Sequence, residues 1–236
     1  MKNELDIIIP IYNEGSTIKK LIKHLEKTIK TNHKIFLIYD SHKDTTLKHL
    51  KKIKSKKFKL IKNNGAGPHS AVLTGFKKTK SRYVLTYMAD DFFNGPIVDN
   101  MVNKMRNGSE IVVASRFIKG GVMKGAPFPK NYLVLISSYL LNKFTNISVH
   151  DSTNGFRLFS RKLLNTVDIE SELGFAYSLE LLSKCNRLKL NISEIPAQWE
   201  ERSEGSSRFK VFKWLPQYLK WYIYGLSTTW LRKKKI

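Results

Sequence analysis

Residues 82–96 read RYVLTYMADDFFNGP, an apolar run that ends in two carboxylates and a Gly-Pro turn. The β-branched and aromatic residues from Val84 to Met88 predict a buried strand. Asp90 and Asp91 would then lie at the carboxyl end of that strand, where open α/β sheets bind their ligands. Adjacent carboxylates there need a cation, a hydrogen-bond network or water. The stretch therefore predicts either a site for a hard divalent cation or a polar turn.

The first ninety residues alternate strand and helix patterns in the order that builds a parallel sheet. Apolar runs predict strands at residues 5–10, 34–40, 58–61 and 84–88, with helical or polar segments between them. We expect Pro10 to end the first strand, because proline lacks the amide donor of a strand ladder. The carboxyl ends of parallel strands share one edge, so the acidic and glycine-containing segments that follow them predict a nucleotide-sized crevice with a metal-binding centre.

The second half of the chain continues with further strands and helices. Residues 110–116 predict a fifth strand, which ends in the base Arg116. Residues 132–144 predict an apolar helix, for which a position in the core is favoured over contact with a membrane. Glu180 lies in an apolar helical run and needs a partner, so it is expected to be either a structural ion-pair member or an active-site acid.

The chain of 236 residues carries 42 Lys and Arg against 19 Asp and Glu, a formal net charge of +23. Such a surface attracts nucleic acid, anionic lipid or phosphorylated substrates, but a compositional bias toward lysine accounts for the excess equally well. No nucleic-acid-binding module is recognisable, so we expect no specific nucleic-acid partner. A single cysteine excludes an intrachain disulfide, and no run of residues predicts a transmembrane helix or a signal peptide. A cytoplasmic protein is expected.

The C-terminal segment, residues 211–236, has a composition of its own. Trp, Tyr and Leu are frequent between residues 214 and 231, and four basic residues follow at 232–235. Such a helix suits the lipid headgroup region, where a basic cluster adds attraction to anionic lipid. The alternative is a helix packed on the domain with a solvated, charged end. We therefore divide the chain into a main domain, residues 1–210, and an amphipathic C-terminal helix, residues 211–236.

Several segments within residues 5–210 together resemble a family 2 glycosyltransferase of the GT-A fold. IIIPIYNE (7–14) is similar to its first strand and nucleotide-binding turn, NGAG (64–67) to its glycine loop, and MADD (88–91) to its metal-binding Asp-x-Asp. Later segments resemble the polyprenyl-phosphate branch, which includes dolichyl-phosphate mannose synthases and undecaprenyl-phosphate glycosyltransferases. These segments are DSTNGFR (151–157), Glu180, EIP (194–196) and WEERSEGSS (199–207).

The resemblance implies an α/β protein with a Rossmann-like GT-A fold, in which helices flank a mostly parallel central sheet. It implies an inverting glycosyltransferase that moves a sugar from a UDP- or GDP-linked donor to a polyprenyl phosphate. One alternative is transfer to a sugar hydroxyl in the synthesis of surface polysaccharide. Another is a non-catalytic domain that binds nucleotide sugars, because Ala89 stands where the family has its first acid. With the C-terminal helix, we expect a peripheral protein on the cytoplasmic face of a membrane.

Donor binding is assigned through the resemblance to residues that follow the predicted strands. Asp91 and Asp90 would hold a divalent cation, Mg²⁺ or Mn²⁺, which stabilises the leaving diphosphate. The residues expected to bind the donor are Pro10, Tyr12, Glu14, Asp40, Gly65, Gly67, Asp90 and Arg116.

Acceptor binding depends on the chemistry of the acceptor. A lipid phosphate needs cationic positioning, for which Arg202, Ser207 and Arg208 are suited because guanidinium forks match phosphate geometry. Arg116 is a second candidate for this role. A sugar hydroxyl needs a general base instead, and Asp151 is the candidate. The expected catalytic residues are Asp91, Asp151 and Arg202.

Overall fold

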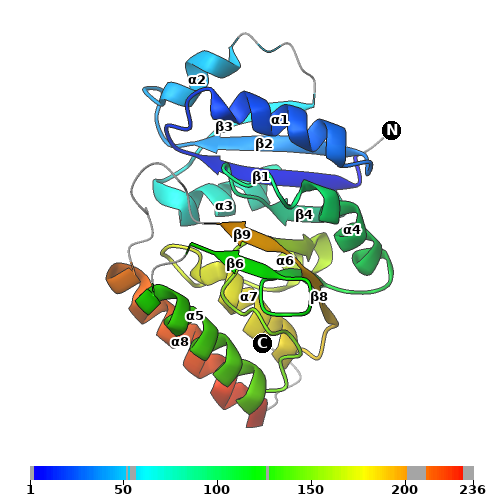
Figure 1. Ribbon diagram of the computed structural model, residues 1–236, viewed down its shortest axis with the longest axis vertical. Coiled ribbons are helices and arrows are strands. Elements are labelled where there is room, and N and C mark those ends of the chain that lie inside the picture. The colour runs from blue at the N-terminus through cyan, green and yellow to red at the C-terminus, as the bar shows by residue number, and fades with distance from the viewer. Residues whose placement is uncertain (1–2, 52, 54–56, 126–127, 201–210, 231–236) are drawn as a thin grey trace.

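A seven-stranded mixed sheet forms the centre of the computed structural model, which describes residues 3–51, 53, 57–125, 128–200 and 211–230 (Figure 1). Every neighbouring pair of strands is parallel except the two pairs that involve β7, which runs antiparallel to both its neighbours. In sheet order the strands are β3 (Phe58–Lys62), β2 (His33–Tyr39), β1 (Leu5–Ile11), β4 (Tyr83–Thr86), β7 (Arg157–Ser160), β5 (Ile111–Ser115) and β8 (Ile192–Pro196).

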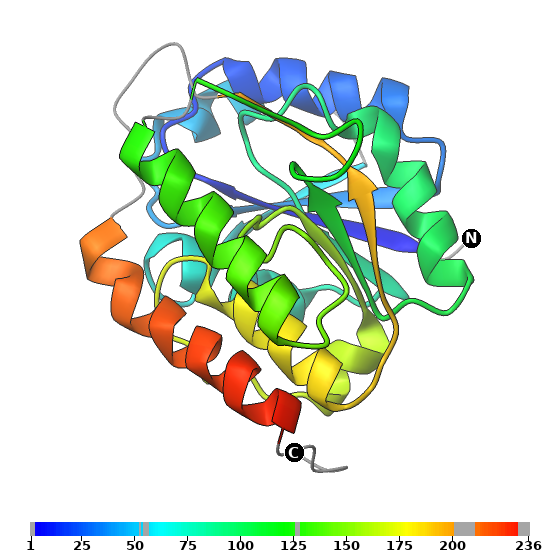
Figure 2. The same cartoon turned by 60° about the horizontal axis from the view of Figure 1, so that its bottom comes forward.

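Helices cover both faces of this sheet, which makes three layers (Figure 2). Alternate side chains of β1 explain the two apolar cores: Ile7 and Ile9 join one cluster, whereas Ile8 joins the other. The first cluster includes residues of α1 (Thr17–Thr28), α2 (Thr45–Leu50) and α4 (Val98–Arg106), the last preceded by a short 3₁₀ turn, η1 (Gly95–Ile97). The second includes residues of α3 (Gly67–Lys78), α5 (Phe128–Phe144), α6 (Arg161–Thr166), α7 (Ala176–Arg187) and α8 (Val211–Trp230).

A small second sheet pairs β6 (Val122–Lys124) with β9 (Gln198–Glu200) in parallel. It lies at the end of β5 and β8, because Ala197 directly follows β8 and donates its backbone N–H to the carbonyl oxygen of Ser115. The expected α/β architecture, with a mostly parallel sheet between helices, is confirmed.

The first strand does not end at Pro10. β1 pairs with β2 as far as Ile11, but it pairs with β4 only as far as Ile8. Beyond Ile8, β1 therefore has a strand neighbour on one side only, and a residue without an amide donor is tolerated in such an edge position. The expectation that Pro10 ends the strand is wrong.

α5 is not the core helix that its composition favoured. Of its side chains that are described, only Ser138 and Leu141 are buried. Six large apolar side chains are 45–62% exposed: Tyr132, Leu133, Leu135, Ile136, Tyr139 and Phe144. Apolar residues surround most of the helix, and such a pattern does not say which side will meet another element.

α8 packs on α7 through one face and leaves another face open. Trp221 is 1% exposed, and the ammonium groups of Lys184 and Lys220 each lie 4.9 Å from its ring centroid. Lys184 also pairs with Glu180 at 2.8 Å, so Glu180 is a member of a structural ion pair. Within the described residues, no helix is both long and apolar enough to cross a membrane. The division of the chain at residue 210 stays a prediction.

Candidate active site

The strand ends named above meet at one edge of the sheet, as the parallel pattern predicts. Pro10 lies in β1, and Tyr12 and Glu14 follow it; Asp40 directly follows β2 and Arg116 directly follows β5. The run Met88-Ala89-Asp90-Asp91 follows β4, which ends at Thr86 rather than at Met88 because only residues 83–86 pair with β1. Tyr12 is 54% exposed, so this edge is open to solvent at the end of β1.

The turns after β1 and β2 fix each other. The backbone N–H of Asn13 donates to both carboxylate oxygens of Asp44 at 3.1 Å, and the backbone N–H of Thr45 donates to Asn13 Oδ1 at 3.0 Å. Asn13 has a φ of 55°, a left-handed conformation that asparagine adopts more readily than most residues. Asp44 also caps α2 by accepting from Thr46 N at 2.8 Å. The sequence places Asn13 and Asp44 in the segments predicted to line the crevice but assigns neither an individual role, although an aspartate before a helical run is a recognisable cap.

Asp40 is anchored to the glycine loop between β3 and α3. Its two carboxylate oxygens accept from Asn63 Nδ2 at 2.7 Å and from the backbone N–H of Gly67 at 2.8 Å. Gly67 begins α3 with a φ of 82°, which side-chain-bearing residues rarely adopt. The side-chain oxygen of Asn63, Oδ1, in turn accepts from the backbone N–H of Gly65 at 3.2 Å. Asp40, Gly65 and Gly67 are thus brought together as predicted, while their contact with a nucleotide stays a prediction.

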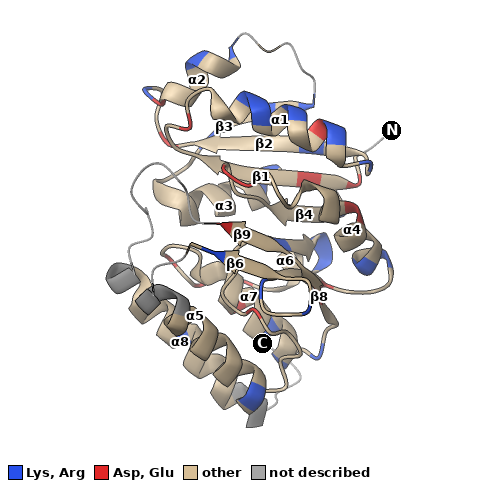
Figure 3. Ribbon diagram, viewed as in Figure 1, with Lys and Arg blue, Asp and Glu red and all other residues tan. Residues whose placement is uncertain are grey.

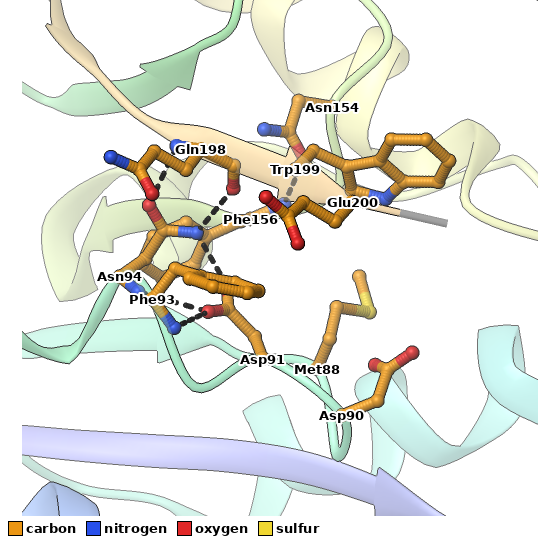
Figure 4. A pocket seen from close by; sticks show the side chains of 10 residues that line it. All are labelled: Met88, Asp90, Asp91, Phe93, Asn94, Asn154, Phe156, Gln198, Trp199 and Glu200. Atoms are coloured by element: carbon orange, nitrogen blue, oxygen red, sulfur yellow. Dashed lines mark hydrogen bonds between the residues drawn. The ribbon is translucent and has the colours of Figure 1, made fainter. Parts of the chain in front are cut away.

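A cavity lies between the loop after β4, the segment before β7, and β9 (Figure 4). Carboxylates, amides and aromatic rings share its lining: Met88, Asp90, Asp91, Phe93, Asn94, Asn154, Phe156, Gln198, Trp199 and Glu200. Figure 4 shows the side chain of Asp91 directed toward Asn94, whereas Asp90 lies apart from that cluster. Three acidic residues therefore face one small, partly apolar space at the end of β4.

Asp91 organises its own turn. One carboxylate oxygen accepts from the backbone N–H groups of Phe93 and Asn94, each at 2.9 Å, and the other accepts from Asn94 Nδ2 at 2.6 Å. Burial raises the pKa of Asp91, and the hydrogen bonds from Asn94 and Phe93 act to lower it. The hydroxyl group of Tyr87 donates to the Asp91 backbone oxygen at 3.1 Å, and burial raises the pKa of that phenol.

The carboxylates of this cavity could hold a cation only together with oxygen atoms of a bound substrate or water. Among the described residues, no group of three His, Cys, Asp or Glu side chains is arranged to hold a metal ion. Mg²⁺ is commonly held by one or two carboxylates, with substrate phosphates and water as its other ligands, and Asp90 and Asp91 fit that mode. Cation binding by these two residues stays a prediction.

Asp151 and Arg116 form a buried ion pair beside this edge. Asp151 is fully buried and accepts from Arg116 Nε at 2.7 Å, Nη2 at 2.8 Å and the backbone N–H at 3.0 Å. Burial would raise the pKa of Asp151, but the Arg116 guanidinium outweighs it and holds the pKa below its ordinary value. The backbone N–H groups of Thr153 and Asn154 also donate to this carboxylate, at 3.3 Å and 3.1 Å. Its role as a general base stays a prediction, and its contacts are those of an anchor.

Arg157 supports the same segment from within the core. It is fully buried, and its guanidinium donates to the carbonyl oxygens of Ser178 at 2.5 Å and Ser152 at 2.6 Å. Burial lowers its pKa to about 10. Arg202, Ser207 and Arg208, expected to bind an acceptor phosphate, lie outside the described residues.

Sequence reasoning missed the residues that close the cavity from the far side. Asn94, Gln198, Trp199 and Glu200 come from two segments about a hundred residues apart in the chain. Trp199 was noted as part of a motif, but neither its position nor that of Asn94 indicates a shared cavity.

A family model and two relatives of known name are similar to this chain. A family model described as Glycosyl transferase family 2 matches residues 6–168. The chain is 26% identical over 222 residues to the dolichol-phosphate mannosyltransferase of Pyrococcus furiosus, which covers 90% of this chain but only 62% of that relative. It is 22% identical over 227 residues to the polyprenol monophosphomannose synthase of Mycolicibacterium smegmatis, with coverage of 88% and 85%. The chain thus spans less than two thirds of the length of the first relative.

Solved structures share the fold at low identity. Glucosyl-3-phosphoglycerate synthase from Mycobacterium tuberculosis, in complex with UDP, aligns with a TM-score of 0.69 at 15% identity and covers 95% of this chain and 80% of that chain. A mannosyltransferase from Pyrobaculum calidifontis, in complex with GDP-Man and Mn²⁺, aligns with a TM-score of 0.63 at 14% identity, with coverage of 100% and 66%. These likenesses confirm the expected GT-A fold.

Proposed function

The chain belongs to glycosyl transferase family 2, and from this we propose that it transfers a sugar from a nucleotide-sugar donor to a polyprenyl phosphate. The observation that carries the proposal is the cavity with Asp90 and Asp91, on the same edge of the sheet as the buried cation of Arg116. Anionic and cationic groups on one edge suit a reaction in which a cation-bound diphosphate leaves and a phosphate attacks.

On the donor side, transfer requires stabilisation of the charge that develops on the departing diphosphate. Asp90 and Asp91 would hold Mg²⁺ or Mn²⁺, which when bound neutralises that charge. Two structural neighbours carry Mn²⁺ together with UDP or GDP-Man, which supports the same arrangement here. Hydrogen bonds from Phe93 and Asn94 hold the carboxylate of Asp91 in place before any ligand arrives.

On the acceptor side, a lipid phosphate is already an anion, so it needs orientation more than a base. Arg116 is suited to this, because its bidentate pairing with Asp151 fixes the guanidinium at the end of β5. We therefore assign to Asp151 the positioning of Arg116 in place of proton abstraction. The two relatives named for transfer to dolichol phosphate or polyprenol monophosphate support this acceptor class. Inversion by direct displacement follows from the family resemblance.

An apolar face across α5 and α8 supports contact with a membrane. The two helices lie side by side in both views, and Leu215, Leu219 and Ile223, one turn apart along α8, are 43–60% exposed (Figures 1 and 2). Neither helix contains an acidic residue, and no Asp or Glu colour marks them in Figure 3. Exposed apolar side chains on helices that carry no Asp or Glu suit the surface of an anionic bilayer. We propose that the protein lies at the cytoplasmic face of that membrane.

The reaction is tested by incubating the full chain with UDP- and GDP-linked sugars, Mn²⁺ or Mg²⁺, and a short polyprenyl phosphate. We expect metal-dependent transfer with one donor and its loss in Asp91→Asn. Transfer to a sugar hydroxyl in place of the lipid phosphate would overturn the acceptor assignment. Binding of nucleotide sugar without turnover on any acceptor would show a non-catalytic domain.

Membrane contact is tested separately by flotation with anionic and neutral liposomes. Replacing Leu219 and Ile223 with glutamine should reduce binding, because it removes exposed apolar side chains that support no core. The matched control replaces Lys19, Lys20 and Lys23 of α1 with glutamine, which lowers the net charge far from this face. If the control reduces binding as strongly as the α8 variant, the attraction is a general effect of charge and the assigned surface is wrong.

A further inference from the structure

Asn94 joins two walls of the carboxylate cavity through a single side-chain amide. Its Nδ2 donates to Asp91 Oδ2 at 2.6 Å and to the backbone oxygen of Gln198 at 2.7 Å, and its Oδ1 accepts from Gln198 N at 2.9 Å (Figure 4). An asparagine amide has two N–H donors and one oxygen, and all of them are used here. Asn94 is 3% exposed, so these bonds are shielded from water.

The two partners of Asn94 belong to different parts of the chain. Asp91 lies in the loop after β4, while Gln198, 104 residues from Asn94, begins β9. The next two residues, Trp199 and Glu200, line the cavity opposite the loop. β9 is not a strand of the central sheet, and among the described residues its one strand partner is the three-residue strand β6. The hydrogen bonds between Asn94 and Gln198 therefore set the distance between this short sheet and the carboxylates of the loop after β4.

The turn that carries Asn94 has little room to relax. A Cβ atom built on the following residue, Gly95, would lie 2.5 Å from Thr28 Oγ1 and 2.8 Å from His24 Nε2. The turn that carries Asn94 therefore packs closely on α1, which limits its movement toward that helix. Because the loop packs on α1, the hydrogen bonds of the Asn94 amide hold β9 at a set position relative to the loop.

We propose that Asn94 is a positioning residue that holds Asp91 and β9 at the separation that a cation-bound donor diphosphate requires. The inference rests on the proposed function, because it takes Asp91 to be a ligand of the cation. Truncating the amide leaves Asp91 with its backbone hydrogen bonds but removes the tie to β9. The expected consequence is weaker binding of the nucleotide with its cation.

The experiment uses the full chain and titrates UDP and GDP by calorimetry, with and without Mn²⁺. In Asn94→Ala we expect the Mn²⁺-dependent affinity to fall about tenfold or more, as the loss of a hydrogen bond to a charged group implies. Asn142→Ala is the matched control, since Asn142 Nδ2 donates to the backbone oxygens of Ile147 and Val149, each at 3.2 Å, away from the cavity. This control should bind as the wild type does, even where its melting temperature falls.

A second measurement is independent of ligands. Hydrogen exchange at the backbone amide of Gln198 should accelerate in Asn94→Ala and stay unchanged in Asn142→Ala, because only the first loses its acceptor. Asn94→Leu, which is similar in size but cannot form hydrogen bonds, should behave in the same way and serves if the alanine variant does not fold.

The two proposals fail in different ways. If the wild type binds a nucleotide with Mn²⁺ and the Asn94 variants bind it equally well, the positioning role is wrong and the proposed function stands. If the wild type binds neither nucleotide with Mn²⁺, the proposed function is wrong, and the inference fails with it.

Discussion

Asp151→Asn distinguishes a buried anchor from a catalytic base. Asp151 is fully buried and the side chain of Arg116 is 8% exposed, so the substitution leaves a buried guanidinium without its counter-charge. Breaking one partner of such a pair costs about 3–5 kcal/mol. For a chain of this size each kcal/mol shifts the melting temperature by about 2–4 °C, so we expect a fall of roughly 6–20 °C.

The assay is thermal unfolding of Asp151→Asn beside a control that removes an exposed pair. Glu4→Gln breaks the contact between Glu4 and Arg106, whose side chains are 29% and 47% exposed. Exposed pairs contribute about 0–1 kcal/mol, so the control should melt near the wild type. The anchor reasoning is refuted, and a general base is supported, if Asp151→Asn loses transfer activity while its free energy of unfolding stays within about 1 kcal/mol of the wild-type value.

The pH dependence of the same difference is a second check. The pKa of Asp151 is lowered in the folded protein, so its contribution is complete above the unfolded pKa of about 3.9 and is lost as the pH falls through the folded value. The stability gap between the wild type and Asp151→Asn should therefore be constant from pH 5 to 8 and close in stronger acid. A gap that does not change below pH 4 would contradict this linkage.

Three further substitutions test the packing around the site. Gly75→Ala should destabilise by about 1–2 kcal/mol in urea unfolding, because its Cβ would lie 2.6 Å from the buried side chain of Ile8; equal stability would show that β1 can yield. Burial lowers the pKa of His69, so the unfolded chain binds a proton at a higher pH than the folded protein does, and the free energy of unfolding should fall from pH 7 to pH 5. This fall should be smaller in His69→Phe; an equal fall in the variant would exclude His69 as the cause. Lys184→Met should cost about 3 kcal/mol by leaving Glu180 buried without its ammonium partner, whereas a neutral result in calorimetry would show that backbone donors suffice.

The exposed face of α5 shows a limit of reading composition. The sequence of residues 132–144 is apolar on most sides, a pattern that favoured a core helix but is also compatible with a helix on a lipid surface. In the structure α5 is buried at Ser138 and Leu141 and exposed at Leu133 and Ile136. The buried side of a uniformly apolar helix depends on which elements pack against it. The spacing of apolar residues within the helix does not identify those elements.

Local sequence patterns were enough to predict the parallel strands β1–β4 and the edge of the sheet on which the site lies. Strand and helix periods alternate along the first ninety residues, crossover connections make such strands parallel, and parallel strands place Asp40, Asp91 and Arg116 at one edge. These are consequences of local pattern and chain chirality. The family resemblance that the comparisons confirm came from the sequence motifs and not from these patterns.

The hydrogen bonds and ion pairs between side chains at that edge follow from tertiary packing instead. Asp151 pairs with Arg116 across 35 residues, and Asn94 holds Gln198 across 104 residues. Such contacts depend on the stagger of strands and the path of loops, to which every intervening residue contributes, so no spacing in the sequence encodes them. Tertiary packing therefore separated a carboxylate that faces the cavity, Asp90, from one that anchors the fold, Asp151.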